Sequence, residues 1–415
     1  MTQLRSPDAA LAQRLLSAHA VRERAHEMLA LGETGVLSHW TVDRTKLDRA
    51  AAYVIETIRQ NYPSLDIPFH ARWRHFAAGG IDRWARLAAN LQWPDAASRA
   101  RAEFDLAIVS VLLDAGAGPD WRYRAADGSL LSRSEGLAVA SIEMFGTGAF
   151  SADPKDKLRA DASRLASMEA AEIAQGFQVS PRNPLIGLEG RASLLRALGR
   201  QVSAAPTIFA GRDIARPGGL FDHLVGLAGS PPRIEAAAIL QAVLTHLGPI
   251  WPSRLSLGGV ALGDCWHHSA LRRTDATDGL VPFHKLSQWL SYSLIEPLQQ
   301  AGVAISHIDG LTGLPEYRNG GFFIDLGALS LKRHEEIKVP HEVNSELVVE
   351  WRALTVALLD DTARLVREAL GLDAKSLPLA KVLEGGTWAA GRRIARERRA
   401  DGSPPLTIIS DGTVF

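Results

Sequence analysis

The chain has 415 residues, 46% of them hydrophobic, so it is long enough for one large domain or for two or three smaller ones. Its 46 basic and 46 acidic residues cancel, and no long block carries one sign. This balance argues against nonspecific attraction to nucleic acid or to an anionic membrane surface. We therefore expect a small-molecule partner.

Cysteine usage and hydropathy indicate the compartment. The single cysteine, Cys265, excludes an intrachain disulfide framework and favours a reducing environment. The N-terminal residues lack a basic stretch followed by an apolar run, and no run of about 18 or more apolar residues occurs. We expect a cytoplasmic protein that does not span a membrane.

Apolar residues recur at three- and four-residue steps along most of the chain, which predicts helices with one buried face. In chain order, helices are expected at residues 9–31, 43–61, 99–115, 133–145, 153–177, 191–204, 234–247, 281–301 and 346–370. Asp153 followed by Pro154 predicts the start of the fifth helix, as a cap with proline at the first helical position. Short strands are expected at 256–262, 322–326 and 406–415.

The order of these elements predicts the fold class. Strands and helices do not alternate, and no Gly-x-Gly-x-x-Gly follows a strand, which argues against a dinucleotide-binding or P-loop fold. We predict a mainly α protein. It is expected to form a single large helical domain over residues 1–415 with a few short strands, and 205–235 is the place where it would divide, if at all.

Two arginines and two histidines lie among aromatic residues near position 70. His70, Arg72, Arg74 and His75 alternate with aromatic side chains, and guanidinium groups beside aromatic faces hold phosphates and planar groups. The alternative is that the aromatic residues belong to the core and the charges to a solvated face.

A glycine-rich turn at 114–123 is followed by a helix start at 133. Asp114, Trp121 and Arg133 lie in these segments, and the amides of a helix N-terminus attract anions. A phosphate between the two segments is one interpretation. An ordinary turn with helix caps is the other.

Cys265, His267 and His268 are metal-ligand residue types close together. A zinc site needs three or four ligands with suitable spacing, and the sequence shows no partner motif for them. We predict no metal and no cofactor, and keep a metal-dependent amidohydrolase or ring-opening enzyme as an alternative.

The densest chemistry lies between residues 284 and 318. His284 and Lys285 begin a helical pattern. A lysine at a helix start is unfavourable because of the helix dipole, which suggests that Lys285 has a functional role. The loop that follows carries Asp309 and Glu316 among glycines. Pro315 precedes Glu316 and restricts the backbone there, so the carboxylate is expected to be held in place.

Several long motifs together resemble the uncharacterised-domain family whose fungal members are uracil catabolism proteins. They are Leu113 to Tyr123, Arg133 to Ala138, Arg216 to Leu224 with Asp222 and His223, Gly263 to His268, and Asp309 to Arg318. The resemblance covers about residues 10 to 410. It implies a role in a pyrimidine breakdown route in which the uracil ring is opened while attached to ribose, giving a ribosylurea-type intermediate.

A fainter pattern is similar to the queuosine salvage glycosidases, which hydrolyse the bond between a ribose 5′-phosphate and its base. Lys285 and Gln288 match their helix signature, and Glu316 stands where they carry an aspartate. This resemblance implies a helical core like that of DNA glycosylases. Because the side chain of Glu316 is one methylene longer than that of aspartate, the resemblance implies a different substrate.

From these patterns we expect hydrolysis of the N-ribosyl bond of a ribosylurea or its 5′-phosphate. A fixed carboxylate stabilises the positive charge that develops on the sugar, and this role is assigned to Glu316, with Asp309 second and Lys285 as charge partner. Expected substrate-binding residues are Arg318, Tyr317, Asp114, Trp121, Arg133, His70, Arg72, Arg74, His284, Asp222 and His223. A noncatalytic nucleotide-binding or scaffold protein is the remaining alternative.

Overall fold

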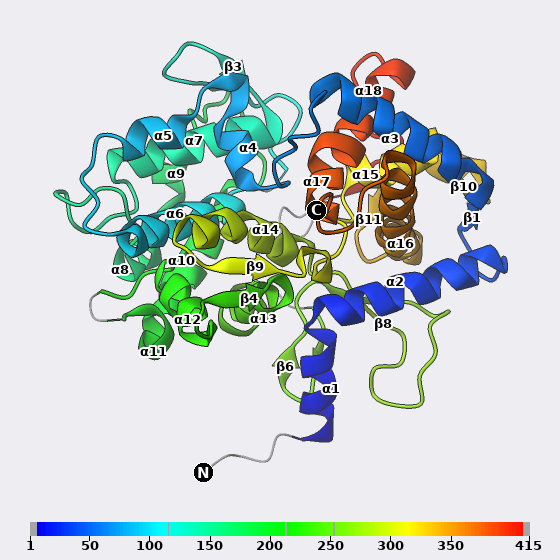
Figure 1. Cartoon of the computed structure of the whole chain (residues 1–415), viewed down its shortest axis with the longest axis horizontal. Helices are drawn as coiled ribbons and strands as arrows, with labels where there is room; N and C mark the ends of the chain where they lie inside the picture. The colour runs from blue at the N-terminus through cyan, green and yellow to red at the C-terminus, as the bar shows by residue number, and fades with distance from the viewer. Residues whose placement is uncertain (1–5, 115, 212–213, 252–253, 410–415) are drawn as a thin grey trace. The chain divides into compact units, whose positions relative to one another are not determined.

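The structure is a computed structural model that describes residues 6–114, 116–211, 214–251 and 254–409. The chain is mainly helical, as predicted (Figure 1). Within these residues the strands are two or three residues long and pair two at a time, so helices build the core.

Two compact units make up the chain, and both are discontinuous in sequence. Among the described residues, unit 1 contains 6–70, 254–288 and 307–409, and unit 2 contains 71–114, 116–211, 214–251 and 289–306. The chain passes from unit 1 to unit 2 inside helix α14 (Lys285–Gln300), between Gln288 and Trp289. A boundary within a helix leaves no linker composition, so the sequence pattern points only to a single domain or a division near 205–235.

Unit 1 is organised around the long helix α16 (Glu346–Leu370), which packs against α2 (Ala18–Glu33) and α3 (Leu47–Asn61). Its bounds match the predicted helix at 346–370, and Gly371 ends it with a left-handed φ of 67°. The other elements of unit 1 are α1 (Pro7–Leu15), β1 (Trp40–Val42), η1 (Arg44–Lys46), β5 (Ser256–Leu257), β6 (Val260–Ala261), β7 (Cys265–His267), β8 (Leu280–Pro282), η4 (Ile308–Gly310), α15 (Tyr317–Asp325), β10 (Leu329–Leu331), η5 (His334–Lys338), β11 (His341–Glu342), α17 (Leu379–Lys381), η6 (Val382–Thr387), α18 (Trp388–Arg398) and β12 (Ile408–Ile409).

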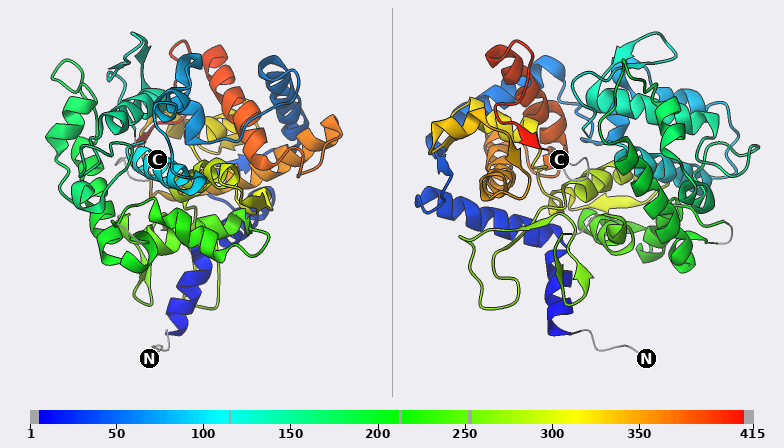
Figure 2. Two further views of the ribbon diagram at one scale, coloured as in Figure 1. Left: turned by 60° about the vertical axis from the view of Figure 1, so that its left-hand side comes forward. Right: turned by 180° about the vertical axis from the view of Figure 1, so that it is seen from behind.

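Helices α15 and α18 pack side by side in unit 1 (Figures 1 and 2). A Cβ at Gly391 of α18 would lie 2.3 Å from the carbonyl oxygen of Arg318 in α15, so only glycine allows this approach. At the other end of the pair, Arg399 forms an ion pair with Asp325 at 2.6 Å. The two helices therefore run side by side in the same direction.

Unit 2 packs its helices around the buried α6 (Ala96–Leu112) and α7 (Arg133–Thr147). Close contact between α8 (Ala162–Ala166) and α10 (Leu188–Ala204) depends on Gly199, where a Cβ would lie 2.3 Å from the backbone nitrogen of Ala166. The remaining elements are α4 (Arg72–Phe76), η2 (Ala78–Gly80), α5 (Arg83–Ala88), β2 (Tyr123–Arg124), β3 (Leu130–Leu131), α9 (Ala170–Gly176), α11 (Pro206–Phe209), α12 (Gly219–Leu227), β4 (Arg233–Glu235), α13 (Ala236–His246), η3 (Gly248–Ile250) and β9 (Ala304–Ser306).

Several predicted elements differ from the structure. The helix expected at 9–31 is divided into α1 and α2. Residues 322–326, expected as a strand, lie in α15, because Glu316 caps a helix there and Phe322 and Phe323 pack into the core. The predicted helix at 153–177 is broken, and its ordered part is α8 and α9. Asp153 is followed by turns, with Lys155 N donating to its side chain. Of the expected strand at 406–415, β12 is present and 410–415 lie outside the described residues.

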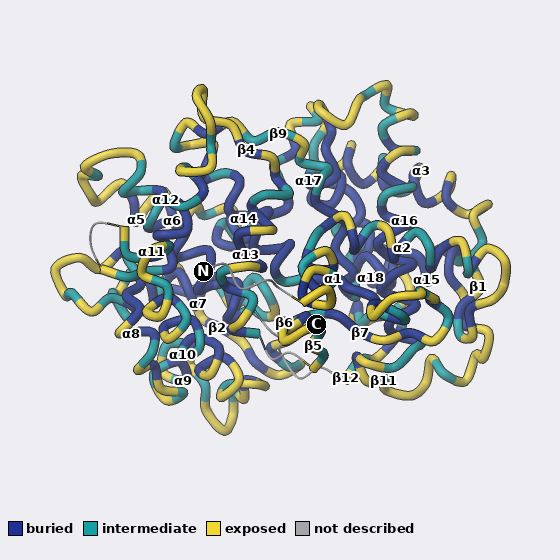
Figure 3. Tube along the Cα trace, turned by 90° about the horizontal axis from the view of Figure 1, so that it is seen from below, coloured by how far each residue is buried: buried dark blue, intermediate teal, exposed yellow. Residues whose placement is uncertain are grey.

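Burial follows the helices. In Figure 3 the dark blue buried residues run along the helices, and the yellow exposed residues gather on connecting loops. Among the described residues, no helix is both long and apolar enough to cross a membrane.

Candidate functional site

A buried ion pair in unit 1 sets the start of α14. Arg352 of α16 donates two hydrogen bonds of 2.8 Å to the two carboxylate oxygens of Asp264, which immediately precedes β7. The Arg352 guanidinium also lies 4.1 Å from the centroid of the Phe283 ring. The hairpin β7–β8 is thereby fastened to the central helix.

Asp264 also receives the backbone of the residues that begin α14. Its carbonyl accepts from the amides of Phe283 and His284, and its carboxylate accepts from the amide of Lys285 at 3.0 Å. Burial alone would raise the pKa of Asp264, but Arg352, the amide of Lys285 and the indole of Trp266 lower it to about 2. A fixed negative charge therefore anchors the turn that carries Lys285.

Gln288 joins this turn to the loop that precedes α15. Its side-chain amide donates to Thr312 Oγ1 at 2.5 Å, and its carbonyl accepts from Thr312 N at 2.8 Å. Both residues are fully buried. Lys285 lies one turn before Gln288 on α14. The hydrogen bonds between Gln288 and Thr312 therefore fix the position of Lys285 relative to the 309–316 loop.

Glu316 is the N-cap of α15. Its carboxylate accepts hydrogen bonds from the amides of Arg318 at 2.8 Å and Asn319 at 2.6 Å. Glutamate is not a preferred N-cap residue, and aspartate or serine would satisfy the same amides with a shorter side chain. The longer side chain is therefore not needed for capping.

The pKa of Glu316 is raised, first because the carboxyl is buried. The two backbone donors and the charges of Lys285 and Arg318 lower it in part, without cancelling the effect of burial. Lys285, which is half-buried, thus lies close enough for its charge to act on Glu316, as the sequence predicts. Burial therefore favours the protonated form of Glu316 more than at an exposed glutamate.

Asp309, the second predicted carboxylate, is tied to the helices that follow it. One oxygen accepts from Arg367 at 2.5 Å and the other from the amide of Leu379 at 2.6 Å. Its side chain is 30% exposed. These bonds fix the beginning of the loop that ends at Glu316.

The two residues after Glu316 form a packed pair. The Arg318 guanidinium lies 4.9 Å from the centroid of the Tyr317 ring, and its Nη1 donates to the carbonyl of Gly402 at 2.9 Å. Arg318 is buried, whereas Tyr317 is half-buried. The charge of Arg318 is therefore held beside the cap of α15.

His284 takes a strained backbone conformation before α14. Its φ is 50°, a left-handed value, and its Nε2 is 2.9 Å from the carbonyl oxygen of Leu15. Burial lowers the pKa of this histidine, so the neutral ring is favoured and Nε2 donates the hydrogen bond. His284 thereby joins the start of α14 to the end of α1.

The metal-ligand residue types of the 265–268 segment do not gather into a site. Cys265 is buried and its pKa is raised by that burial. His268 instead pairs with Glu350 at 3.1 Å, and His267 is exposed. In the part of the chain that the structure describes, no group of three or more His, Cys, Asp or Glu side chains is placed to hold a metal ion.

His70 pairs with Glu384, a residue that the sequence analysis did not single out. The two side chains are buried and lie 2.7 Å apart, between His70 Nδ1 and Glu384 Oε2. The ring of His70 also lies 5.6 Å from that of Trp388. Glu384 belongs to η6, a turn of π-helix between α17 and α18.

Arg72 of unit 2 is the centre of a second buried polar cluster. Its guanidinium pairs with Asp114 at 2.9 Å and donates to Ser110 Oγ at 2.8 Å and to Ser134 Oγ at 3.0 Å. Ser134 Oγ donates to Asp114 at 2.7 Å and lies 3.1 Å from His75 Nδ1. The turn at 114 and the helix start at 133 thus meet around the side chain of Arg72. A phosphate between the two segments stays a prediction.

Three other predicted residues of unit 2 lie in differing surroundings. Trp121 is fully buried, and its indole donates to the carbonyl of Phe177 at 3.0 Å. Arg74 pairs with Glu296 at 2.7 Å. Arg133 is exposed at the first position of α7.

Asp222 lines a cavity of about 820 Å³ in unit 2. Arg101 donates two hydrogen bonds of 2.8 Å to its carboxylate. The next residue, His223, lies 3.2 Å from His246, between their Nε2 atoms. Gly219, from the same motif, approaches the backbone of Phe209 so closely that a Cβ would lie 2.3 Å from its carbonyl oxygen.

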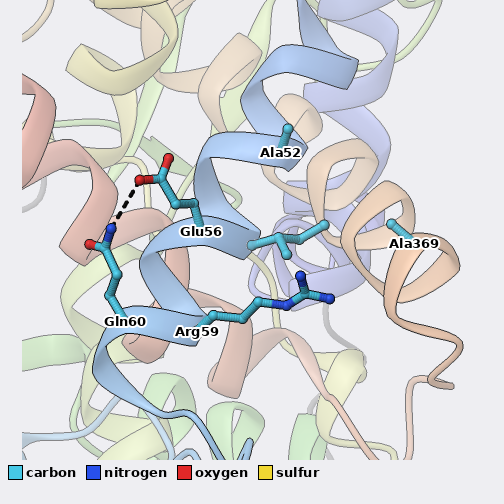
Figure 4. Close-up of a pocket in the computed structure, with 6 residues that line it drawn as sticks. Ala52, Glu56, Arg59, Gln60 and Ala369 are labelled. Carbon is cyan, nitrogen blue, oxygen red and sulfur yellow. Dashed lines mark hydrogen bonds between the residues drawn. The ribbon is translucent and has the colours of Figure 1, made fainter.

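A smaller surface hollow of about 540 Å³ lies in unit 1 between α3 and the end of α16 (Figure 4). Glu56, Arg59 and Gln60 of α3 line it, and Glu56 accepts a hydrogen bond from Gln60 at 2.9 Å. None of the predicted site residues lines this hollow.

The predicted residues therefore fall into two sets. Unit 1 holds Glu316, Lys285, Asp309, Tyr317, Arg318, His284 and His70, and unit 2 holds Arg72, Arg74, Asp114, Trp121, Arg133, Asp222 and His223. Sequence reasoning missed Arg352 and Glu384 because both lie in helical segments without loop motifs. For Arg352 the only signal was a charged residue within the expected helix at 346–370, and Glu384 lies outside every helix that the sequence predicts.

Comparisons with known proteins agree over nearly the whole chain. The model of the family described as "Protein of unknown function (DUF1688)" matches residues 14–415. Protein urg3 of Schizosaccharomyces pombe (strain 972 / ATCC 24843) is 39% identical over 411 residues, which are 97% of this chain and 98% of that protein. Uracil catabolism protein 4 of Lachancea kluyveri is 37% identical over 435 residues, covering 96% of this chain and 98% of that protein.

Proposed function

The chain belongs to the DUF1688 family, and we propose that it is an enzyme of uracil breakdown that hydrolyses the N-ribosyl bond of a ribosylurea or of ribosylurea 5′-phosphate. The name of one relative, uracil catabolism protein 4, supports the pathway. The reaction is our inference from the residues around Glu316.

The observation that carries the proposal is the state of Glu316. It is a buried carboxyl whose pKa is raised by burial, with Lys285 near enough for its charge to act on it. A carboxyl with these properties suits general base catalysis, because its pKa is moved toward neutral pH while the lysine keeps the ionised form accessible. The pKa of Asp264, which is paired with Arg352, shifts in the opposite direction.

The reaction balances without a cofactor. Glu316 takes a proton from a water molecule, the water oxygen bonds to C1′, and the C1′–N bond breaks with its electron pair going to the urea nitrogen. That nitrogen then receives the proton, so the products are ribose and urea. Positive charge develops at C1′ in the transition state, and an ionised Glu316 stabilises it more than it stabilises the neutral substrate.

Capping is the other role that Glu316 could serve, and one substitution separates the two. Glu316→Asp keeps a carboxylate that caps helices well, but withdraws it by one methylene. If capping were the whole role, the variant would keep full activity. We expect it to remain folded and to lose activity.

The test is to follow urea release from ribosylurea and from its 5′-phosphate by the wild type, Glu316→Gln and Glu316→Asp. Glu103→Gln is a matched control, since Glu103 in unit 2 is a buried glutamate whose pKa is also raised by burial. Urea release at the wild-type rate by the control, with much slower release by both Glu316 variants, supports the proposal.

Other results would overturn it in distinguishable ways. Full urea release by Glu316→Gln would remove Glu316 from the mechanism. No release by the wild type from either compound would remove the reaction, and activity that appears only with added zinc would favour a metal-dependent amidohydrolase. Recovery of pathway proteins with an inactive wild type would favour a scaffold.

A further inference from the structure

A single turn of π-helix interrupts the last long helix of unit 1. Residues 379–398 run continuously through α17, η6 and α18, and all six residues of η6 are buried. π-helical turns are rare and occur frequently at functional sites. At Gly386 of this turn, a Cβ would lie 2.6 Å from the side chain of Val54 in α3, so glycine is required for the turn to pack here.

The π-helical turn lies alongside the loop that carries Glu316. Before the turn, the amide of Leu379 donates to Asp309 at the start of the loop. After it, Gly391 lies against the carbonyl of Arg318 at the end of the loop. Since α15 also contacts η6, residues 309–318 and 379–391 form two adjacent sides of one region of unit 1.

Glu384 is the charged residue of the turn, and within the described residues only one of its carboxylate oxygens accepts a hydrogen bond. His70 holds Oε2 at 2.7 Å, and His70 is itself fixed by its backbone bond to the carbonyl of Ala380 at 2.9 Å. Oε1 makes no hydrogen bond to the described residues. The carboxylate is thus oriented by a histidine and keeps acceptor capacity for a ligand.

Two further polar atoms on the same elements have no partner within the described residues. They are Asn319 Oδ1, in the first turn of α15, and Thr387 Oγ1, at the end of η6. Both side chains are fully buried. Orphaned buried polar atoms cost free energy, so their retention points to a ligand that satisfies them.

We propose that Glu384, positioned by His70, binds the vicinal hydroxyls of the ribosyl group. Glu384 and Asn319 offer acceptors, and a sugar diol supplies the matching O–H donors. The inference rests on the proposed function, because it assigns the sugar side of the site whose reacting side is Glu316. Neither the sequence motifs nor the names of the relatives assign a role to Glu384.

The test measures both equilibrium binding, by calorimetry, and urea release, with ribosylurea and its 2′,3′-dideoxyribosyl analogue. Loss of a hydrogen bond to a charged group is expected to weaken binding of ribosylurea to Glu384→Gln by about 10- to 100-fold. KM should rise by the same factor, with kcat changed much less. The dideoxy analogue should bind the wild type and the variant equally.

His70 and a matched control complete the design. His70→Phe should weaken ribosylurea binding as Glu384→Gln does, and His70→Asn should restore most of it, because its amide can donate where Nδ1 does. Glu350→Gln changes the other buried His–Glu pair of unit 1, whose carboxylate accepts from the backbone amides of Ser38, His39 and Trp40. It should lower thermal stability and leave the affinity unchanged.

The binding measurements separate this inference from the reaction. If the wild type binds ribosylurea and Glu384→Gln binds it more weakly, the sugar site stands even when no urea is released. Equal affinities of the wild type and Glu384→Gln for ribosylurea overturn the inference. So does a wild type that binds no ribosyl compound.

Discussion

Asp264 and Glu316 are both buried carboxyl groups of unit 1 that accept backbone amides near a helix start, yet their pKa values move in opposite directions. Arg352 neutralises Asp264 with two hydrogen bonds, so its pKa falls to about 2. Within the residues that the structure describes, Glu316 has no such bidentate arginine partner, and burial raises its pKa although Lys285 and Arg318 oppose it. The same residue chemistry therefore gives a permanent charge at one position and a group able to exchange protons at the other.

The comparison also separates anchoring from reactivity. Asp264 positions the backbone of Lys285, whereas Glu316 receives only the electrostatic influence of that lysine. A carboxylate held ionised by arginine is a poor proton acceptor at neutral pH. We therefore assign Asp264 to positioning and Glu316 to the reaction.

The largest expected effect comes from removing the arginine partner. Arg352→Met leaves the charge of Asp264 buried and uncompensated, which should lower the free energy of unfolding by about 3–5 kcal/mol. Urea unfolding followed by circular dichroism measures it. Arg393→Met, at a partly exposed pair with Glu56, is the control and should cost no more than about 1 kcal/mol. Equal losses for the two variants would contradict the anchoring role.

Shortening Glu316 should affect activity next most strongly. Glu316→Asp should lower kcat for ribosylurea by about 10²-fold, comparable to the loss of one preorganised transition-state contact, with an unfolding free energy close to that of the wild type. Steady-state urea release and chemical unfolding, made on the same preparation, provide the two numbers. An aspartate variant of normal activity would reduce Glu316 to a cap.

The two carboxyl groups should respond differently to pH. The folded pKa of Asp264 lies below its ordinary value of 3.8, so its ionised form stabilises the fold above that value, and about 2 kcal/mol is lost as the pH falls through about 2. The difference in unfolding free energy between the wild type and Asp264→Asn should therefore shrink between pH 4 and pH 2.

Glu316 has the opposite sign because its folded pKa is raised. Its buried charge opposes folding at pH values above that raised pKa, and protonation relieves the cost as the pH falls through it. As a general base it must be ionised, so kcat/KM for ribosylurea should rise with pH through a value above 4.5. A pH profile that is flat from pH 4.5 to pH 8 would argue against this role.

The smallest effect is expected at Asp309. Its pair with Arg367 involves a side chain that is 30% exposed, so Asp309→Asn should lower the free energy of unfolding by less than about 1 kcal/mol. Activity should fall only to the extent that the 309–316 loop becomes less fixed at its first residue. A loss of kcat as large as that of Glu316→Asp would make Asp309 a second reacting carboxylate.

The sequence alone determined the helical class, the long helix at 346–370, and the identity of the loop that carries Glu316. These features depend on local periodicity and on dense, specific motifs, which act over a few residues. It also indicated that Lys285 and Glu316 belong together, since both lie in motifs close in the chain. Residues 322–326 show the limit of such patterns, because a capping carboxylate and packing of Phe322 decided their helix.

Only the tertiary structure decided which carboxylates are neutralised and how the chain divides. Asp264 meets Arg352 across 88 residues, and His70 meets Glu384 across 314, so neither pairing leaves a local signal in the sequence. The division between the units inside α14 leaves none either. Local patterns place residue types on elements. The protonation of an ionisable side chain is set by its burial and by its charge partners. Both depend on how segments that are distant in sequence pack together.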